Sequence, residues 1–137
     1  MDKHLATAIL LETLVRSAYA DRRSGSVQPL QWSILRYLRQ TAPDPRSLQA
    51  IARYVGVTAA PASRAVDTLN KRGFLTKKRN PDNARSVSIA ITSQGLELLE
   101  NDPLFAIGEQ IRQLPAEERS AFIRTLRHLV LHKDESK

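Results

Sequence analysis

The spacing of apolar residues predicts a mostly helical chain with one short β-hairpin. Residues 2–23 carry apolar side chains at too many positions for a single stripe, and Glu12, Arg16 and Asp21 supply only a thin polar strip. A helix of this kind is buried on more than one side. In a chain of 137 residues this pattern indicates an interface between subunits. A Ser-Gly-Ser stretch at 24–26 ends the helix.

Three further helices are predicted toward the two ends of the chain. One covers residues 29–40 and begins with a proline, which the first turn of a helix tolerates. A second is capped by Thr92 or Ser93 and is interrupted at Pro103, and the last begins near Pro115. Their apolar residues are Trp32, Ile34, Leu35 and Leu38, then Leu96, Leu98 and Leu99, then Phe122, Ile123, Leu126, Leu129 and Val130.

Residues 47–73 have the pattern of two helices joined by a tight turn. Ser47 caps a helix over 48–55, and Thr58 caps a second helix that ends at Gly73. Helices that cross steeply need a small residue at their contact, a glycine in the turn and apolar residues at fixed offsets. Seven positions meet this requirement: Ile51, Ala52, Val55, Gly56, Val57, Ala62 and Ala65. The pattern predicts a helix-turn-helix.

A β-hairpin after this motif is expected to complete a winged helix. Residues 86–91 alternate polar and apolar side chains, as a half-buried strand does, and residues 74–79 form the partner strand. The cluster at 80–83 (Asn-Pro-Asp-Asn) is typical of a turn. We expect the connecting loop to be longer than two residues.

The net positive charge of the chain is concentrated in this same region. The formal net charge is +7. Within 46–91 only Asp67 and Asp82 oppose nine basic residues, namely Arg46, Arg53, Arg64, Lys71, Arg72, Lys77, Lys78, Arg79 and Arg85. Such a segment is typical of polyanion binding, and a solvated basic face is the alternative. On the hairpin, Lys77, Lys78, Arg79 and Arg85 are placed to reach the DNA backbone or minor groove. Protection of an edge strand is the alternative there, but it does not require a single sign of charge.

Several classes of function are not supported by the composition. Cysteine is absent, which excludes disulfides, thiolate metal sites and thiol redox sensing. No apolar run approaches the ~18 residues that span a membrane, and no secretion signal is evident, so we expect a cytoplasmic protein. No paired carboxylates, phosphate-binding glycine loop or nucleophile–base set emerges. We therefore expect neither an enzyme nor a cofactor.

Two histidines near the end of the chain have a spacing that could bind a metal, but they lack further ligands. His128 and His132 stand four residues apart on the last predicted helix, a spacing that suits zinc. No third ligand is evident nearby, except Asp134, Glu135 or His4. Cationic histidines are also favoured at a helix C-terminus without any metal. We therefore expect no metal.

The order of these elements resembles the MarR family of bacterial winged helix-turn-helix transcriptional regulators. Residues 63–74 are similar to the recognition helix of the family and its exit, and residues 80–85 are similar to its wing loop. Ile91-Thr92-Ser93-Gln94-Gly95 before a helix, and Gln31-Trp32-Ser33-Ile34-Leu35, also match. The family usually has Asp-x-Arg in the wing, whereas this chain has Asn83 before Arg85. Unless Asp82 substitutes for the acidic residue, the wing is expected to be looser.

The resemblance implies one MarR-like domain over 1–137, mainly α with a small β-wing. Residues 28–100 would form the winged helix-turn-helix lobe, and 1–23 and 103–137 the N- and C-terminal dimerisation helices. It implies a homodimer that binds double-stranded DNA and represses genes under the control of a small ligand. An aromatic or phenolic effector is the candidate, and the alternatives are activation in place of repression and an effector that is another metabolite, a metal or absent. Trp32, Tyr19, Tyr37 and Phe105 lie in segments suited to an effector pocket, although such residues are more often core. A winged-helix module that binds protein or nucleic acid without promoter specificity is the competing interpretation.

The start of the recognition helix is expected to face the major groove. Arg64 is the candidate for a guanine, because its guanidinium fits O6 and N7, and a phosphate contact is the alternative. Asp67 follows three residues later and is expected to restrain Arg64 or Lys71. The predicted DNA-binding residues are Ser47, Thr58, Ala59, Pro61, Ser63, Arg64, Lys71, Lys77, Lys78, Arg79 and Arg85. Of these, the three lysines and Arg79 would bind phosphate, and Ser47 would add a phosphate contact. Arg85 would reach the DNA backbone or the minor groove.

Overall fold

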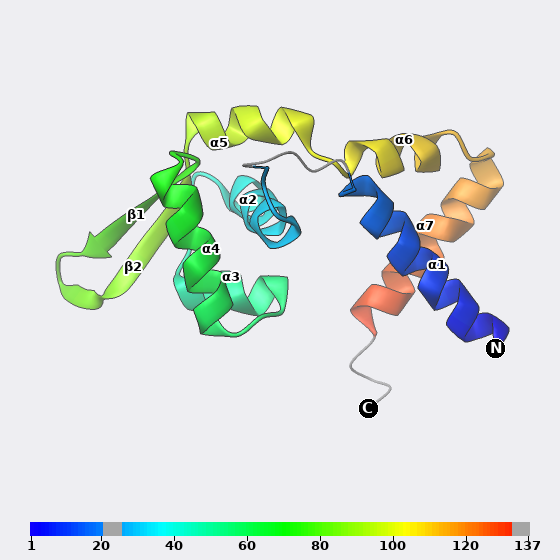
Figure 1. Cartoon of the computed structure of the whole chain (residues 1–137), viewed down its shortest axis with the longest axis horizontal. Helices are drawn as coiled ribbons and strands as arrows, with labels where there is room; N and C mark the ends of the chain where they lie inside the picture. Colours follow the sequence, from blue (N-terminus) through cyan, green and yellow to red (C-terminus); the bar gives the residue numbers. More distant parts are fainter. Residues whose placement is uncertain (21–25, 133–137) are drawn as a thin grey trace. The chain divides into compact units, whose positions relative to one another are not determined.

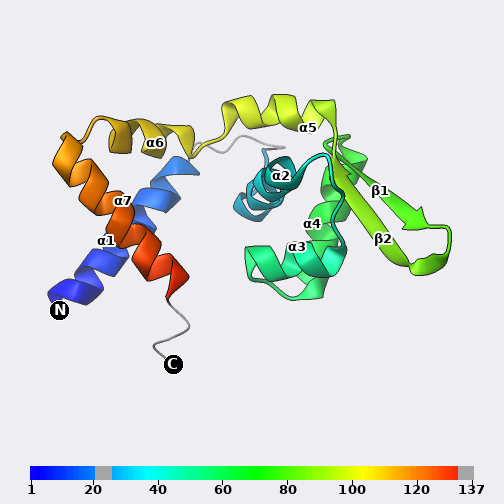
Figure 2. The same ribbon diagram turned by 180° about the vertical axis from the view of Figure 1, so that it is seen from behind.

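The structure of the chain is a computed structural model that describes residues 1–20 and 26–132, without the side chains of Ala84 and Arg85. The described residues form two units. One unit holds residues 26–102, and the other holds residues 1–20 and 103–132. Figure 1 shows the elements of each unit, and Figure 2 shows them from behind.

The unit of residues 26–102 is a winged helix with a compact apolar core. Its elements are α2 (Pro29–Thr41), α3 (Leu48–Val55), α4 (Ala59–Lys71), β1 (Leu75–Asn80), β2 (Asn83–Ile91), α5 (Ser93–Leu98) and the 3-10 helix η1 (Leu99–Asn101). The largest fully buried side chains of the core are Ile34, Leu35, Leu38, Ile51, Leu69, Leu75, Ile89 and Leu99, with Val66. Full burial of a side chain of this size stabilises the fold by about 1.5–3 kcal/mol. The predicted bounds of α2, α3 and α4 are confirmed to within a residue or two.

The helix-turn-helix forms at the predicted residues. The Ser47 hydroxyl caps α3 by accepting a hydrogen bond from the backbone N–H of Ala50 at 3.1 Å. Gly56 ends α3 with φ 77°, a left-handed conformation that glycine adopts without steric cost. Thr58 occupies the N-cap position of α4, but its side chain makes no capping hydrogen bond, so that part of the prediction is wrong. The physical reason is Pro61, which stands at the third helical position and has no N–H to donate.

The wing is an antiparallel hairpin with a shorter turn than expected. Asn80 pairs with Asn83, so the connection is only Pro81-Asp82, and the expectation of a loop longer than two residues is wrong. The additional residues lie instead in a register shift beside Arg79, which pairs with Val87. The Asn80 side chain stabilises the tight turn by accepting a hydrogen bond from the backbone N–H of Asp82 at 3.0 Å. A β-bulge thus accommodates the length that the sequence suggested for the loop.

The exit of the wing fixes the start of α5. The Thr92 hydroxyl accepts from the Gly95 N–H at 3.1 Å and donates to the Gly73 carbonyl at 2.7 Å, which decides between Thr92 and Ser93 as the cap. A Cβ atom at Gly95 would collide with the backbone oxygen of Phe74. The close approach of these two segments therefore requires glycine.

A buried ion pair connects α2 with the end of η1. Nε and Nη2 of Arg36 each donate to a carboxylate oxygen of Asp102 at 2.7 Å. The Asp102 side chain is 4% exposed and that of Arg36 is 20% exposed. The partners are 66 residues apart, so no local pattern in the sequence predicts this pair.

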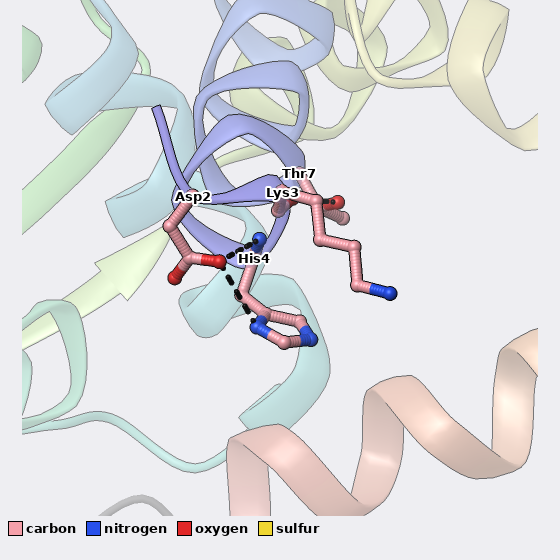
Figure 3. A network of polar contacts seen from close by, with 4 residues as sticks. All are labelled: Asp2, Lys3, His4 and Thr7. Carbon is pink, nitrogen blue, oxygen red and sulfur yellow. Dashed lines mark hydrogen bonds and ion pairs between the residues drawn. The ribbon is translucent and has the colours of Figure 1, made fainter.

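The other unit contains α1 (Lys3–Ala18), α6 (Phe105–Arg112) and α7 (Ala116–Leu131). Asp2 caps α1 by accepting from the His4 backbone N–H at 3.1 Å, and Thr7 donates to the Lys3 carbonyl at 2.8 Å (Figure 3). The predicted helix over 2–23 ends earlier than expected within the described residues, and residues 21–25 lie outside them. Helix α6 was not predicted, although Ile107 and Ile111 are spaced as on one helix face.

The helices of this unit bury none of their described residues. Large apolar side chains are instead exposed on α1 and α7, namely Leu5, Ile9, Leu10, Leu11, Val15, Ile123, Leu129, Val130 and Leu131. Among the described residues, no helix is both long enough and apolar enough to cross a membrane.

Candidate nucleic-acid interface

The N-terminal half of α4 presents a small, exposed surface opposite its buried face. Thr58, Ala59 and Arg64 are exposed, and Pro61 and Ser63 are half-buried. The face toward the core consists of Ala62, Ala65, Val66 and Leu69, all of which are buried. The predicted groove-facing residues are thus brought together on the outer side of one helix.

Arg64 lies on this outer surface with its guanidinium available. Its carbonyl accepts from the Thr68 hydroxyl at 3.1 Å, as in any exposed helical turn. Its side chain makes no hydrogen bond or ion pair with a described residue. A guanidinium with five donors and no internal acceptor is suited to bind a guanine edge or a phosphate.

Asp67 does not restrain Arg64 or Lys71 as the sequence suggested. Its Oδ1 atom lies 2.6 Å from Nζ of Lys77, which is on β1. The prediction was wrong because spacing along α4 considers only neighbours on the same helix, whereas β1 packs against α4 and brings in a lysine. The ion pair joins the recognition helix to the wing.

The basic residues of the wing lie on its two different faces. Lys77 pairs with Ile89 and Arg79 pairs with Val87, so these side chains share the face that carries the buried Ile89. Lys78 pairs with Ser88 and belongs to the opposite face. Lys78 and Arg79 are exposed, as is Lys71 at the end of α4, and the Arg85 side chain lies outside the described part of the structure.

Gln49 and Arg46, on the α3 side of this surface, are two further candidates for DNA contact that were not among the predicted DNA-binding residues. A small cleft of about 100 Å³ lies between α3, α4 and the hairpin, and Gln49, Ser63 and Lys77 are its polar lining. Arg46 precedes the capping Ser47, and its backbone exchanges two 2.8 Å hydrogen bonds with Ile89. Its Nε atom is buried and has no hydrogen-bond partner among the described residues. A basic residue directly before a helix N-cap was the available sequence signal.

The remaining candidates of the sequence analysis lie in parts of the chain other than α3, α4 and the hairpin. The rings of His128 and His132 lie 4.7 Å apart, and the described residues contain no group of three His, Cys, Asp or Glu side chains that suits a metal. Asp134 and Glu135 lie outside the described residues. Of the aromatic candidates, Trp32 is buried in the core of the winged helix, Tyr37 stacks on Tyr54 with ring centroids 4.2 Å apart, and Phe105 is about half exposed. Tyr19 caps the C-terminus of α1.

The two crossing helices, the glycine turn and the basic hairpin define a winged helix-turn-helix protein. The model described as "MarR family" matches residues 27–87, from the start of α2 into the second strand of the wing. Residues 27–87 are thus similar to the MarR family, and the chain has the fold of a MarR-family transcriptional regulator. The resemblance seen in the sequence is confirmed.

Solved structures share this fold over most of the chain. A probable transcriptional regulator from Pseudomonas aeruginosa is 25% identical, with a TM-score of 0.69, and the match covers 88% of this chain and 93% of that one. The PcaV transcriptional regulator from Streptomyces coelicolor, in complex with its natural ligand, is 22% identical, with a TM-score of 0.70 and coverage of 90% and 89%. BpsR from Bordetella bronchiseptica, whose DNA binding is regulated by 6-hydroxynicotinic acid, is 23% identical, with a TM-score of 0.64 and coverage of 88% and 98%. No curated protein sequence matches the chain.

Proposed function

We propose that this protein is a homodimeric, sequence-specific transcriptional regulator that binds an inverted repeat in double-stranded DNA and acts as a repressor. The observation that carries the proposal is the outer surface of α4, where an unpaired Arg64 stands among exposed small residues beside a basic wing. The whole positive excess of the chain lies in the segment that builds this surface. Clustered cations supply phosphate affinity, and side chains at the start of the helix supply sequence readout.

The contacts divide according to the chemistry of the side chains. Arg64 is the candidate for a guanine, with Thr58 and Ser63 as hydrogen-bonding residues and Ala59 and Pro61 as apolar contacts to a thymine methyl. The candidates for phosphate are Ser47, Lys71, Lys77, Lys78, Arg79 and Arg85. A twofold dimer reads half-sites about one helical turn apart, roughly 10 base pairs from centre to centre.

The unit of α1, α6 and α7 supports the homodimer. It buries none of its described residues and exposes large apolar side chains, including Leu10 at 67% and Leu131 at 73%. Apolar surface of this extent on a water-soluble protein marks an interface. A second copy of the same unit supplies a matching apolar surface, as twofold symmetry requires. Residues 1–23 and 103–137 are therefore proposed as the dimerisation helices, and 28–100 as the DNA-binding lobe.

Release by a small effector is supported by the similar structures. PcaV is described with its natural ligand, and DNA binding by BpsR is regulated by an aromatic acid. We infer a small aromatic or phenolic effector for this chain on that similarity.

The test is selection of bound sequences from a random duplex library at about 150 mM salt, where phosphate contacts alone no longer dominate binding. Arg64→Ala is selected in parallel, with Arg39→Ala as the matched control, because Arg39 is exposed on α2 outside the basic segment. We expect an inverted repeat from the unaltered protein and from Arg39→Ala, and a blurred consensus from Arg64→Ala. Binding without a consensus, which disappears as salt increases, would support the interaction module without promoter specificity instead.

A further inference from the structure

Asp67 is the only acidic residue on α4, and it stands on a surface proposed to approach phosphates. A carboxylate at such a position opposes DNA binding, because like charges repel. Its Oδ1 atom is held 2.6 Å from Nζ of Lys77, with side-chain exposures of 48% for Asp67 and 32% for Lys77. The acid therefore neutralises one of the cations that the wing offers to DNA.

We propose that Asp67 is a positioning residue for Lys77 that lowers the affinity of the protein for DNA backbone of any sequence. The inference rests on the proposed function, since it concerns the same interface. In the free protein the ammonium group binds Asp67. A phosphate that binds Lys77 must displace this carboxylate, which then lies unpaired next to the DNA.

The position of Lys77 in the hairpin explains why Asp67 and a phosphate compete for it. Lys77 is opposite Ile89, which is 1% exposed, so its side chain leaves the hairpin on the face that carries the core. Lys77 also lines the cleft together with Ser63 and Val66 of α4. The ammonium group lies 2.6 Å from Oδ1 of Asp67, so a phosphate that approaches Lys77 on this face competes with the carboxylate.

The expected size of the effect follows from the exposure of the pair. An ion pair exposed to this extent has a coupling that corresponds to about a two- to fivefold change in an equilibrium constant. Each phosphate neutralised adds about 0.9 to the magnitude of the log–log salt slope. In the unaltered protein, a phosphate that binds Lys77 adds little to the salt slope, because the released Asp67 carboxylate then binds a cation from solution. Removal of the acid is therefore expected to increase both the affinity and the salt slope.

The experiment is a double-mutant cycle on binding to a duplex of random sequence, followed by fluorescence anisotropy at several salt concentrations. The proteins are the unaltered chain, Asp67→Asn, Lys77→Gln and the double variant. Asp82→Asn is the matched control, because it removes the other acid of the basic segment, and that carboxylate has no ion pair with a described residue. Asp67→Glu retains the charge at the same position. Thermal unfolding of each variant verifies the fold.

We expect Asp67→Asn to tighten binding about two- to fivefold per subunit and to steepen the salt slope by about 0.9 per subunit. Asp67→Glu should remain within about twofold of the unaltered protein. In the Lys77→Gln background the same Asp67→Asn change should produce only the smaller effect seen with Asp82→Asn. Equal tightening by Asp67→Asn in the unaltered protein and in Lys77→Gln would overturn the inference. Asp67 would then act only by electrostatic repulsion of the DNA and not through Lys77. Failure of the unaltered protein to bind any duplex would overturn the proposed function together with this inference.

Discussion

Replacing Asp102 with asparagine tests how strongly the buried ion pair holds α2 to the end of η1. The unaltered carboxylate accepts two 2.7 Å hydrogen bonds from Arg36, in the bidentate geometry that gives the strongest pairs. Asparagine retains the shape but has no charge and offers only one acceptor oxygen to this guanidinium. The variant therefore removes the negative charge that accepts both hydrogen bonds from this largely buried cation.

The magnitude follows from the burial of the two partners. Loss of one partner of a buried ion pair costs about 3–5 kcal/mol, because the remaining charge is uncompensated. Asp102 is 4% exposed, but Arg36 retains 20% exposure, so water solvates part of the residual charge. We therefore expect the free energy of unfolding to decrease by about 3 kcal/mol, the lower end of that range.

The assay is urea denaturation followed by circular dichroism, at one fixed protein concentration because the proposed dimer would make stability depend on concentration. Asp44→Asn is the matched control, since Asp44 is exposed in the connection after α2. A further variant, Arg36→Met with Asp102→Leu, removes both charges and should recover most of the loss. A decrease below about 1 kcal/mol for Asp102→Asn, similar to the control, would refute the reasoning, because it would place the pair among solvent-screened ion pairs.

Two further predictions concern the ends of helices in the winged-helix unit, and both are measured by the same denaturation assay. Ser47→Ala should lower the free energy of unfolding by about 1 kcal/mol, because it removes the cap of α3, whereas Thr58→Ala should change it by less than half of that, because Pro61 denies Thr58 a partner. Equal losses at the two caps would contradict this explanation. Gly95→Ala should destabilise the protein by more than about 2 kcal/mol, because its Cβ would collide with the backbone oxygen of Phe74. Unchanged stability would show that the two segments can separate without cost.

The sequence by itself determined the helix-turn-helix. The N-cap at Ser47, the left-handed Gly56 and the small and apolar residues around them act over a few residues, so their outcome depends little on the remainder of the chain. The location of the basic surface could also be predicted from the sequence, because nine of the cations occur within 46–91 and the exposed side of α4 is set by its helical period.

Only the tertiary structure decided which charges meet. Asp67 binds Lys77 of the adjacent strand and not a neighbour on its own helix, and Arg36 binds Asp102 across 66 residues. Helical spacing ranks neighbours along one element, whereas partners of this kind are selected by the packing of one element on another. The length of the wing turn was decided in the same way, because cross-strand pairing placed the surplus residues in a bulge beside Arg79. Local signals thus fixed the elements and the location of the charge, and packing between elements fixed which of those charges remain available to a partner.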